Sequence, residues 1–280
     1  MTTLITGASG QVGSRFAARM RQWRAPMRLL LRTEEQAAPW WDAGVEVVVG
    51  DLRDADTLER AVDGVDAVVH IAAAFRGTGQ GVPAEEAFAV NRDASIGLAE
   101  AALKQGVRRF VMASTGLVYG QPNRGRPAFE DDDLQPSGHY PESKRDAEVA
   151  LRAMAELGLR IVRLGYCYGE GDPHLAQSLR WARSWPAHQR LHLVHHADAS
   201  QGLWLALRTE GVDGRAYNIA DDAPITGWEL HEFNGERFVD SGTQVEDPWS
   251  GLMSTARARD ELGYRPIYPT AYTARAAGAL

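Results

Sequence analysis

The chain has 280 residues, of which 44% are hydrophobic and 24% charged, and its net charge is −7. This size and composition predict a soluble protein of one large domain or two unequal ones, with a sizeable core. The acidic balance argues against a nucleic-acid partner, because such partners need broad basic surfaces. No apolar run is long enough to cross a bilayer and Met1 leads directly into the first expected strand, so we expect neither a membrane anchor nor a secretory leader.

Cysteine usage bears on the cellular compartment. The chain contains one cysteine, Cys167, which cannot form an internal disulfide. Nothing in the sequence therefore indicates an oxidising environment, and we expect a cytoplasmic protein.

Strand-like and helix-like segments alternate through the first half of the chain. Such alternation predicts βαβ units and a parallel sheet that is buried on both faces. Right-handed crossovers make this an α/β doubly wound Rossmann sheet. The expected strands are 2–6, 27–32, 45–50, 67–71, 109–113 and 160–164, and the expected helices are 12–23, 34–43, 55–62, 84–105 and 142–157.

The alternation loosens after Gly165, which suggests a division of labour along the chain. We expect residues 1–164 to form a dinucleotide-binding domain, with a returning segment near 189–210. Residues 165–280 are expected to form mainly a smaller C-terminal substrate lobe, with further strands at 192–195 and 216–219.

The stretch TLITGASGQVGSRF, residues 3–16, places three glycines between an expected strand and an expected helix. Gly7 permits a sharp turn, Gly10 lets the backbone approach a pyrophosphate, and Gly13 allows the helix to pack closely on its strand. The free N–H groups at the helix N-terminus favour phosphate. This context predicts a dinucleotide site. The expected cofactor contacts at the turn are Gly7, Ser9, Gly10, Gln11, Val12 and Gly13.

The spacing Gly-x-x-Gly-x-x-Gly resembles the short-chain dehydrogenase/reductase superfamily, in particular its extended branch of epimerases, dehydratases and reductases. The resemblance continues along nearly the whole chain, and a small-molecule substrate and a homodimer formed through a two-helix face are what it implies. Further matching segments are HIAAAF, ASTGLVYG, GHYPESKRDAE, RLGYCYGEGD, HHADAS, AYNIADDAPIT and STARARDELGYRPIYPT.

The choice of dinucleotide depends on the end of the second expected strand, MRLLLR. A carboxylate there would bind the ribose hydroxyls of NAD and repel a 2′-phosphate, but Arg32 stands in its place. A guanidinium pairs well with phosphate, so we predict NADP in preference to NAD. The alternative is that Arg32 simply reaches solvent.

The family resemblance implies further cofactor contacts. Asp51 and Leu52 match the adenine contacts, with the carboxylate on the amino group and the leucine on the ring. Ala72 and Ala73 match the segment beside the cofactor. Asn91 matches the asparagine that supports the helix behind the active site.

Tyr140 and Lys144 are four residues apart in an expected helical stretch, so both project from one face. Hydride transfer between a nicotinamide and a carbonyl carbon leaves an oxygen that must gain or lose a proton. Tyr140 is the expected acid/base and also a cofactor contact. A nearby ammonium would lower the pKa of its phenol, and Lys144 is expected to do this while holding the nicotinamide ribose.

A third group should orient the substrate oxygen. In ASTGLVYG, Thr115 falls at the family's catalytic Ser/Thr position, and Ser114, expected near the substrate, is interpreted as mainly structural. The dehydratases of this branch carry an Asp-Glu pair here, for proton removal and water elimination, whereas this chain has Thr115 and Gly116. Dehydration is therefore disfavoured.

The chain also departs from the nucleotide-sugar pattern of the family. Tyr166 stands where an asparagine near the substrate diphosphate is usual, and Leu191, beside Arg190, stands where an arginine is usual. Losing both contacts would weaken diphosphate recognition by several kcal/mol. Tyr166 is an expected substrate contact. The tryptophans after Gly165 favour an apolar or ring-shaped substrate, or they simply form core, the candidates being Trp181, Trp185 and Trp204.

Two clusters invite other interpretations. The acidic run Glu130–Asp133 is interpreted as a solvated loop. Four histidines are close together in the sequence, but the segment reads as a loop entering a strand and no carboxylate lies at ligand spacing, so we expect no metal site. These histidines are His188, His192, His195 and His196.

The sequence thus supports one leading function and two alternatives. The leading prediction is an NAD(P)-dependent oxidoreductase that interconverts a ketone and a secondary alcohol on a small organic molecule. One alternative is a nucleotide-sugar 4-epimerase with retained NAD. The other is a non-catalytic NAD(P)-sensing regulator, which the presence of Tyr140 and Lys144 disfavours.

Overall fold

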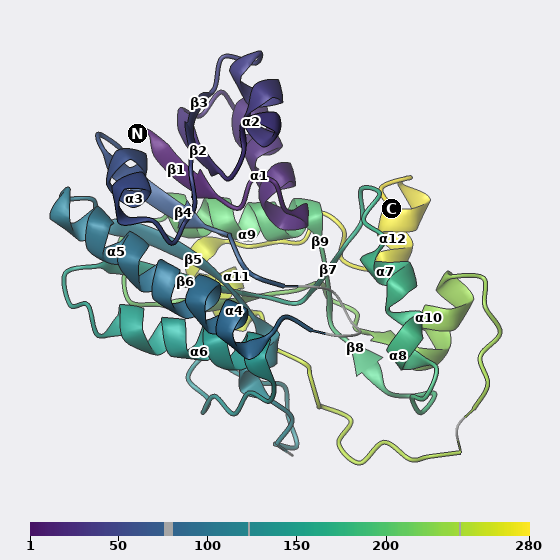
Figure 1. The fold of residues 1–280 in the computed structure, drawn as a ribbon. Coiled ribbons are helices and arrows are strands. Elements are labelled where there is room, and N and C mark those ends of the chain that lie inside the picture. The colour runs from purple at the N-terminus through teal and green to yellow at the C-terminus, as the bar shows by residue number, and fades with distance from the viewer. Residues whose placement is uncertain (76–80, 123, 241) are drawn as a thin grey trace.

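A parallel sheet forms the centre of the molecule (Figure 1). The computed structural model describes residues 1–75, 81–122, 124–240 and 242–280, and within them this sheet has seven strands in the order β10-β6-β5-β4-β1-β2-β3. Every neighbouring pair is parallel. The strands are β1 (Thr3–Thr6), β2 (Met27–Leu31), β3 (Glu46–Val49), β4 (Ala67–His70), β5 (Arg109–Thr115), β6 (Gly158–Leu164) and β10 (Ala216–Ile219).

Helices cover both faces of this sheet. One face carries α1 (Gln11–Gln22), α2 (Glu34–Trp41), α9 (His196–Arg208) and α11 (Ala256–Leu262). The other carries α3 (Ala55–Val62), α5 (Ala94–Lys104) and α6 (His139–Arg152). No helix of the described residues combines the length and apolarity needed to cross a membrane. The predicted doubly wound α/β fold is confirmed.

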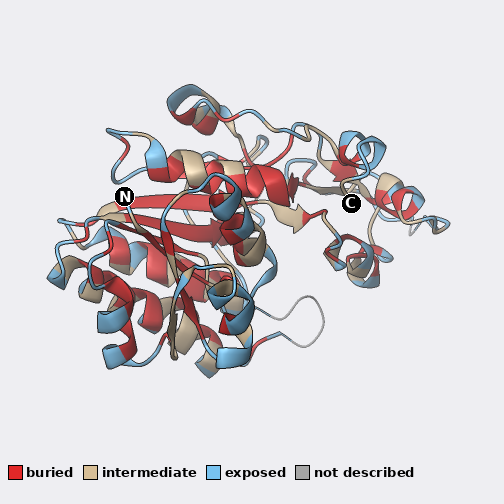
Figure 2. Ribbon diagram, turned by 90° about the horizontal axis from the view of Figure 1, so that it is seen from above, coloured by how far each residue is buried: buried red, intermediate tan, exposed pale blue. Residues whose placement is uncertain are grey.

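The strands can be buried on both faces because consecutive side chains point to opposite sides. Leu4 packs against the α3–α5–α6 face, whereas Ile5 packs against the α1–α9 face, and neither is exposed. Val68 and Val69 of β4 divide in the same way. Figure 2 shows the result, with buried strands and helices whose inner sides are buried and outer sides exposed.

Each of the six strands expected in the first half is present, but one later expectation was wrong. Residues 216–219 do not belong to the smaller lobe, because β10 pairs in parallel with β6 at the edge of the central sheet. The returning chain thus contributes a strand as well as α9. The expected strand 192–195 corresponds to β9 (Leu193–His195), which pairs instead with β7 (Tyr166–Tyr168).

Two helices differ from their predicted form near the site. The helix expected over 84–105 consists of α4 (Ala84–Phe88), a π-helical turn η1 (Ala89–Asp93) and α5. A π turn inserts one extra residue into the helical ladder, which is a feature often found at functional sites. The helix expected over 142–157 begins earlier and ends earlier, so Tyr140 lies in the first turn of α6.

The smaller lobe follows β6 and lies beside the carboxyl ends of the sheet strands, on the right in Figure 1. Its core includes Tyr168, Leu193, Leu230 and Phe233. Its elements are β7, α7 (His174–Gln177), α8 (Leu179–Ala182), β8 (Arg190–Leu191), β9, β11 (Ile225–Thr226), α10 (Gly227–Phe233) and α12 (Ala271–Ala276). A short 3₁₀ turn, η2 (Gly116–Tyr119), follows β5.

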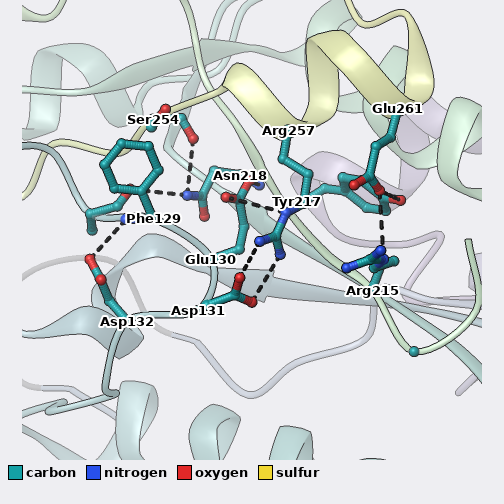
Figure 3. A network of polar contacts seen from close by, with 12 residues as sticks. Phe129, Glu130, Asp131, Asp132, Arg215, Tyr217, Asn218, Ser254, Arg257 and Glu261 are labelled. Carbon is teal, nitrogen blue, oxygen red and sulfur yellow. Dashed lines mark hydrogen bonds and ion pairs between the residues drawn. The ribbon is translucent and has the colours of Figure 1, made fainter.

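The acidic run Glu130–Asp133 is not a solvated loop at its start. Glu130 is buried, and its carboxylate accepts a hydrogen bond from the backbone N–H of Asn218 in β10 at 3.0 Å. Asp131 pairs with Arg257 of α11 (Figure 3). Burial raises the pKa of Glu130. The sequence pattern missed this because the partners come from the other end of the chain.

Candidate active site

The glycine turn connects β1 to α1 in the way the sequence predicts. Gly7 has a φ of +78°, and a Cβ on it would lie 2.6 Å from the backbone nitrogen of Ala72. A Cβ on Gly13 would lie 2.1 Å from the carbonyl oxygen of Gly7. Both positions therefore require glycine, one for its conformation and for the approach of a neighbouring strand end, the other for contact between turn and helix.

The start of α1 is open to an anion. Gly10, its N-cap residue, gives no side-chain hydrogen bond, and the first turn contains no acidic residue. The first backbone N–H groups of the helix are then available to phosphate oxygens, and the helix dipole favours negative charge there. A Cβ on Gly10 would meet only the Gly7 carbonyl oxygen, at 3.3 Å. The residues at this turn fit a dinucleotide pyrophosphate, as predicted, with exposed Ser9 and Gln11 beside it.

Two guanidinium groups lie at the edge expected to hold the adenosine ribose. Arg32 is exposed one residue beyond β2, and its charge acts on the carboxylate of Asp51. The Arg53 side chain binds that carboxylate at 2.9 and 2.7 Å. Hydrogen bonds from Arg53 lower the pKa of Asp51 to about 2. Arg53 was missed in the sequence because nothing in its spacing distinguishes it from other surface arginines.

A chain of buried hydrogen bonds begins beside the glycine turn. The backbone N–H of Ala72 donates to Thr6 Oγ1 at 3.2 Å, and Thr6 Oγ1 lies 2.7 Å from His70 Nδ1. His70 Nε2 lies 2.8 Å from Ser95 Oγ, which donates to the carbonyl oxygen of Asn91. Since Ser95 must accept from His70, the ring is protonated on Nε2 and accepts from Thr6 on Nδ1. Burial lowers the pKa of His70 to about 3, which keeps this pattern fixed.

Asn91 extends the chain of hydrogen bonds to Tyr140. Its side chain exchanges hydrogen bonds with the backbone of Ala74 at 2.7 and 3.2 Å. Its Nδ2 also donates to Ser143 Oγ at 3.0 Å, and Ser143 donates to the carbonyl oxygen of Tyr140 at 2.8 Å. Asn91 is fully buried in η1. It thus joins the segment after β4 to the first turn of α6, the supporting place that the sequence predicted, and direct contact with a cofactor stays a prediction.

Tyr140 and Lys144 lie one helical turn apart in α6. Burial lowers the pKa of Lys144 to about 8, opposed by the charge of Glu148 one turn further on. Burial raises the pKa of Tyr140 above its ordinary value. The predicted lowering of the phenol pKa by Lys144 therefore does not hold in the protein alone, where loss of hydration raises this pKa. Tyr140 is protonated at neutral pH, which is the form that can act as an acid.

The two hydroxyls at the end of β5 have different surroundings. Ser114 is buried and donates to Glu148 at 2.5 Å, in line with the predicted structural role. Thr115 accepts a hydrogen bond from the backbone N–H of Leu117 at 3.2 Å, which leaves its own proton for another acceptor. Thr115 is thus suited to donate to a substrate oxygen, and its substrate contact, like that of Ser114, stays a prediction.

A buried ion pair supports both β5 and α6 beneath these hydroxyls. Arg163 Nη2 lies 2.6 Å from Glu148 Oε2, and both side chains are almost completely buried. Arg163 also donates to Tyr119 Oη at 2.7 Å and to the carbonyl oxygen of Glu130 at 3.0 Å. Breaking such a pair from one side leaves a buried charge unpaired, at a cost of about 3–5 kcal/mol. Glu148 is therefore held by structural partners and is not available as a catalytic acid or base.

Gly116 follows Thr115 where dehydratases of this branch carry an acid. A Cβ on Gly116 would lie 2.5 Å from the sulfur of Met253, which is buried. Met253 is held there by its backbone N–H, which donates to His192 Nδ1 at 3.1 Å. The space beside position 116 is therefore taken by a thioether, and the structure agrees with the sequence in offering no acid there.

Phe75 links Tyr140 to residues of the smaller lobe. The rings of Phe75 and Tyr140 have centroids 4.6 Å apart, and His174 lies 6.4 Å from Phe75. Tyr166 donates through its hydroxyl to the carbonyl oxygen of His174 at 2.8 Å, so its proton is not available to a substrate, whereas its ring face is. Phe75 and His174 were not predicted. Neither belongs to a recognisable spacing, and only tertiary packing brings them together.

The other departures from the nucleotide-sugar pattern are also visible. Leu191 lies in β8 and packs into the lobe core. Arg190 donates to the carbonyl oxygen of Pro248 at 2.5 Å and lies over the ring of Trp249. The guanidinium next to the expected clamp position is therefore already bound to protein groups.

The clustered histidines serve packing and hydrogen bonding. His192 lies 3.0 Å from the carbonyl oxygen of Asp221, and His195 lies 2.7 Å from that of Ala279. His196 binds Asp172 at 2.6 Å. Within the residues that the structure describes, no group of three or more histidines, cysteines and carboxylates is arranged to hold a metal ion.

The fold and these residues define a class of protein. The structure combines an open glycine turn at a parallel sheet with a tyrosine and a lysine on the helix after β5. This is the arrangement of enzymes of the extended short-chain dehydrogenase/reductase type. A family model described as the NAD dependent epimerase/dehydratase family matches residues 3–220, and the chain belongs to that family. The protein is thus an NAD(P)-dependent oxidoreductase of this family.

Individual relatives differ in activity. A dTDP-glucose 4,6-dehydratase of Streptomyces antibioticus is 29% identical, over 95% of this chain and 88% of its own length. A 4-hydroxy-2-methyl-3-oxo-4-farnesyl-3,4-dihydroquinoline-1-oxide ketoreductase of Stigmatella aurantiaca is 27% identical, over 97% of this chain and 83% of its own length. The solved dTDP-glucose 4,6-dehydratase DesIV of Streptomyces venezuelae, with NAD bound, matches with a TM-score of 0.78 and 28% identity, covering 95% and 92% of the two chains.

Proposed function

We propose that the protein reduces a ketone on a small organic molecule, with NADPH preferred to NADH. The observation that supports reduction is the phenol of Tyr140, a proton donor at neutral pH that lies one helical turn from Lys144 and is joined through Asn91 to the segment after β4. A bound nicotinamide supplies hydride to the carbonyl carbon. The hydroxyl of Thr115 donates a hydrogen bond to the carbonyl oxygen, and Tyr140 gives that oxygen its proton, so that a secondary alcohol forms.

Lys144 acts on this reaction through its charge. With a pKa of about 8 it is mostly an ammonium at neutral pH, even though it is almost completely buried. In that form it stabilises the phenolate that remains once Tyr140 has given up its proton, and it offers hydrogen bonds to ribose hydroxyls. Above pH 8 it loses this charge, so reduction should decline.

The preference for NADPH rests on Arg32 and Arg53. Arg32 follows β2 directly, and its side chain has no hydrogen bond or ion pair to a described residue. Arg53 binds the carboxylate of Asp51, on which the charge of Arg32 also acts. A 2′-phosphate placed there would gain charge-assisted hydrogen bonds.

Dehydration and nucleotide-sugar epimerisation have less support. Position 116 has no acid, and its space is filled by Met253. A sugar nucleotide needs cations for its diphosphate, whereas Arg190 is bound to Pro248. The retained Tyr140 and Lys144 favour catalysis over sensing.

The decisive experiment is to purify the protein, identify any nucleotide it retains and follow oxidation of NADPH and NADH with simple ketones. We expect no tightly retained NAD and ketone-dependent oxidation of NADPH. Copurifying NAD together with interconversion of UDP-glucose and UDP-galactose would overturn the proposal in favour of epimerisation.

A further inference from the structure

A continuous series of aromatic rings runs from Tyr140 into the smaller lobe. After Phe75 and His174, the ring of Tyr166 lies 6.3 Å from His174 and 6.0 Å from Trp181. Trp181 in turn lies 4.6 Å from Trp185. We call these five side chains the aromatic row: Phe75, Tyr166, His174, Trp181 and Trp185. They come from four separate segments of the chain, the end of β4, the strand β7, the helix α7 and the α8 region.

The row is not simply core. Phe75, its member nearest to Tyr140, is 46% exposed, although it is a large apolar ring in contact with the ring of Tyr140. Tyr166, Trp181 and Trp185 pack against the lobe core but are only partly buried. Trp204 differs, since it stacks on Trp23 and packs with the α1–α9 face. The sequence could not separate these tryptophans; the structure places Trp181 and Trp185 near the site.

His174 gives the row one polar group. Its Nδ1 lies 3.1 Å from Asp172 Oδ1, and its backbone N–H donates to the same oxygen at 2.9 Å. The second carboxylate oxygen of Asp172 is held by His196 at 2.6 Å. Although burial acts against ionisation, these hydrogen bonds keep the pKa of Asp172 below its usual range. His174 therefore donates from Nδ1, while its Nε2 has no hydrogen-bond partner among the described residues.

Trp181 adds an unsatisfied donor. Its indole N–H is buried and has no acceptor in the part of the chain that the structure describes. A buried donor without an acceptor costs about 1–3 kcal/mol. A ligand that places a hydrogen-bond acceptor at the Trp181 indole N–H would remove this cost.

We propose that the aromatic row is the ring-binding part of the substrate site, and that the substrate is a ketone on or next to a planar, aromatic or conjugated ring system with a polar substituent for His174 Nε2. This rests on the proposed function in that Tyr140 marks the reacting end. Aromatic rings pack on one another edge to face or offset-stacked, at centroid distances similar to those within the aromatic row.

Two arginines of α1 that reach the segment after β7 are occupied, since Arg15 and Arg19 both bind the side chain of Glu170. Arg15 also donates to the Glu170 carbonyl oxygen at 2.6 Å. A diphosphate would have to displace these contacts, whereas a planar neutral ring would not.

The test is calorimetric titration of the full chain with 2-naphthol, a planar probe with one hydroxyl, and with its saturated counterpart 2-decalol. The two probes are compared without NADP⁺, because 2-decalol is a secondary alcohol that the proposed reaction would oxidise. 2-Naphthol, which cannot be oxidised to a ketone by hydride loss, is also titrated with NADP⁺. We expect 2-naphthol to bind about tenfold more tightly than 2-decalol. Equal binding of the two probes would overturn the proposal.

Variants locate the binding. Phe75→Ala, at an exposed position where folding is not at risk, and Trp181→Leu should each weaken 2-naphthol about fivefold. The control Trp41→Leu, at an exposed tryptophan in α2, should change nothing. His174→Phe keeps a ring but removes the nitrogen, so it should weaken 2-naphthol and leave naphthalene unchanged. If Phe75→Ala binds like the unmodified protein, the row is not the site.

The two proposals fail separately. If ketones are reduced by NADPH but 2-naphthol shows no preference, the ring-binding proposal is wrong and the proposed function stands. If 2-naphthol binds at the row but no ketone is reduced, the proposed function is wrong and the ring site stands.

Discussion

The cofactor side and the substrate side of Tyr140 are built on different principles. On the cofactor side, backbone turns and buried hydrogen bonds are matched atom for atom, from Thr6 through His70 and Asn91 to the first turn of α6. On the substrate side, half-buried rings lie beside Tyr140, and the Trp181 indole has an unsatisfied donor.

This difference teaches where change is tolerated. A polar network in which every donor has its acceptor has one arrangement, so substitutions there should damage the site broadly. Packed rings can be exchanged for other rings at modest cost, so substitutions there should alter which ligand binds. The predictions that follow probe this contrast in order of decreasing expected effect.

Tyr140→Phe removes the proton donor without changing the ring. We expect kcat for ketone reduction to fall by about 10²–10⁴-fold, because proton transfer to the developing alkoxide is lost. The dissociation constant for NADPH, measured by fluorescence titration, should change less than about threefold. Unchanged turnover would show that Tyr140 takes no part in the mechanism. The cofactor side and the substrate side would then not meet at Tyr140.

Gly13→Ala tests the close packing of the cofactor side. The added Cβ would lie 2.1 Å from the carbonyl oxygen of Gly7, so turn and helix must separate. We expect a loss of about 3 kcal/mol in the free energy of unfolding and at least tenfold weaker NADPH binding.

Gly97→Ala in α5 is the matched control for this change. Its Cβ would lie 3.3 Å from the end of the flexible Leu58 side chain, and alanine favours the helix. Denaturant unfolding should show it within about 1 kcal/mol of the unmodified protein. Equal behaviour of the two alanine variants would show that the turn is not tightly constrained.

Arg32→Glu tests the ribose edge. We expect the ratio of kcat/KM for NADPH to that for NADH to fall by about 10–100-fold, because a carboxylate repels the 2′-phosphate and binds a ribose hydroxyl. Arg108→Glu, the same charge change at an exposed position at the opposite end of the sheet, is the control. If the NADPH/NADH ratio of kcat/KM changes equally in both variants, the change comes from net charge and Arg32 has no specific role.

Asp221→Asn tests a group of the smaller lobe. Asp221 is 2% exposed, neither carboxyl oxygen has a hydrogen-bond partner among the described residues, and burial raises its pKa to about 9. The folded protein therefore keeps a proton that the unfolded chain releases above pH 4. Stability from this group is full below pH 4 and declines as pH rises toward 9.

Asparagine does not titrate, so the Asp221→Asn variant does not lose stability in this way as the pH rises. We expect it to match the unmodified protein near pH 4 and to be more stable by about 5 kcal/mol at pH 8, as measured by urea unfolding. A constant difference across this pH range would show that Asp221 does not titrate between the two states.

The sequence by itself determined the features that depend on the local backbone. The alternating strands and helices, the glycine turn, and the Tyr140–Lys144 spacing are set by residues a few positions apart, so their patterns could be read directly. The hydroxyls at the end of β5 were assigned from the family resemblance, and their contacts with a substrate stay predictions. Element ends were less certain, as the early start of α6 shows.

Only the tertiary structure decided what depends on distant partners. It placed β10 in the central sheet, buried Glu130 against Asn218, and brought Phe75 next to His174. It also showed that loss of hydration raises the pKa of Tyr140, the opposite of the lowering expected from Lys144. These outcomes follow from desolvation and packing, which depend on the whole fold and leave no mark in the spacing of residues along the chain.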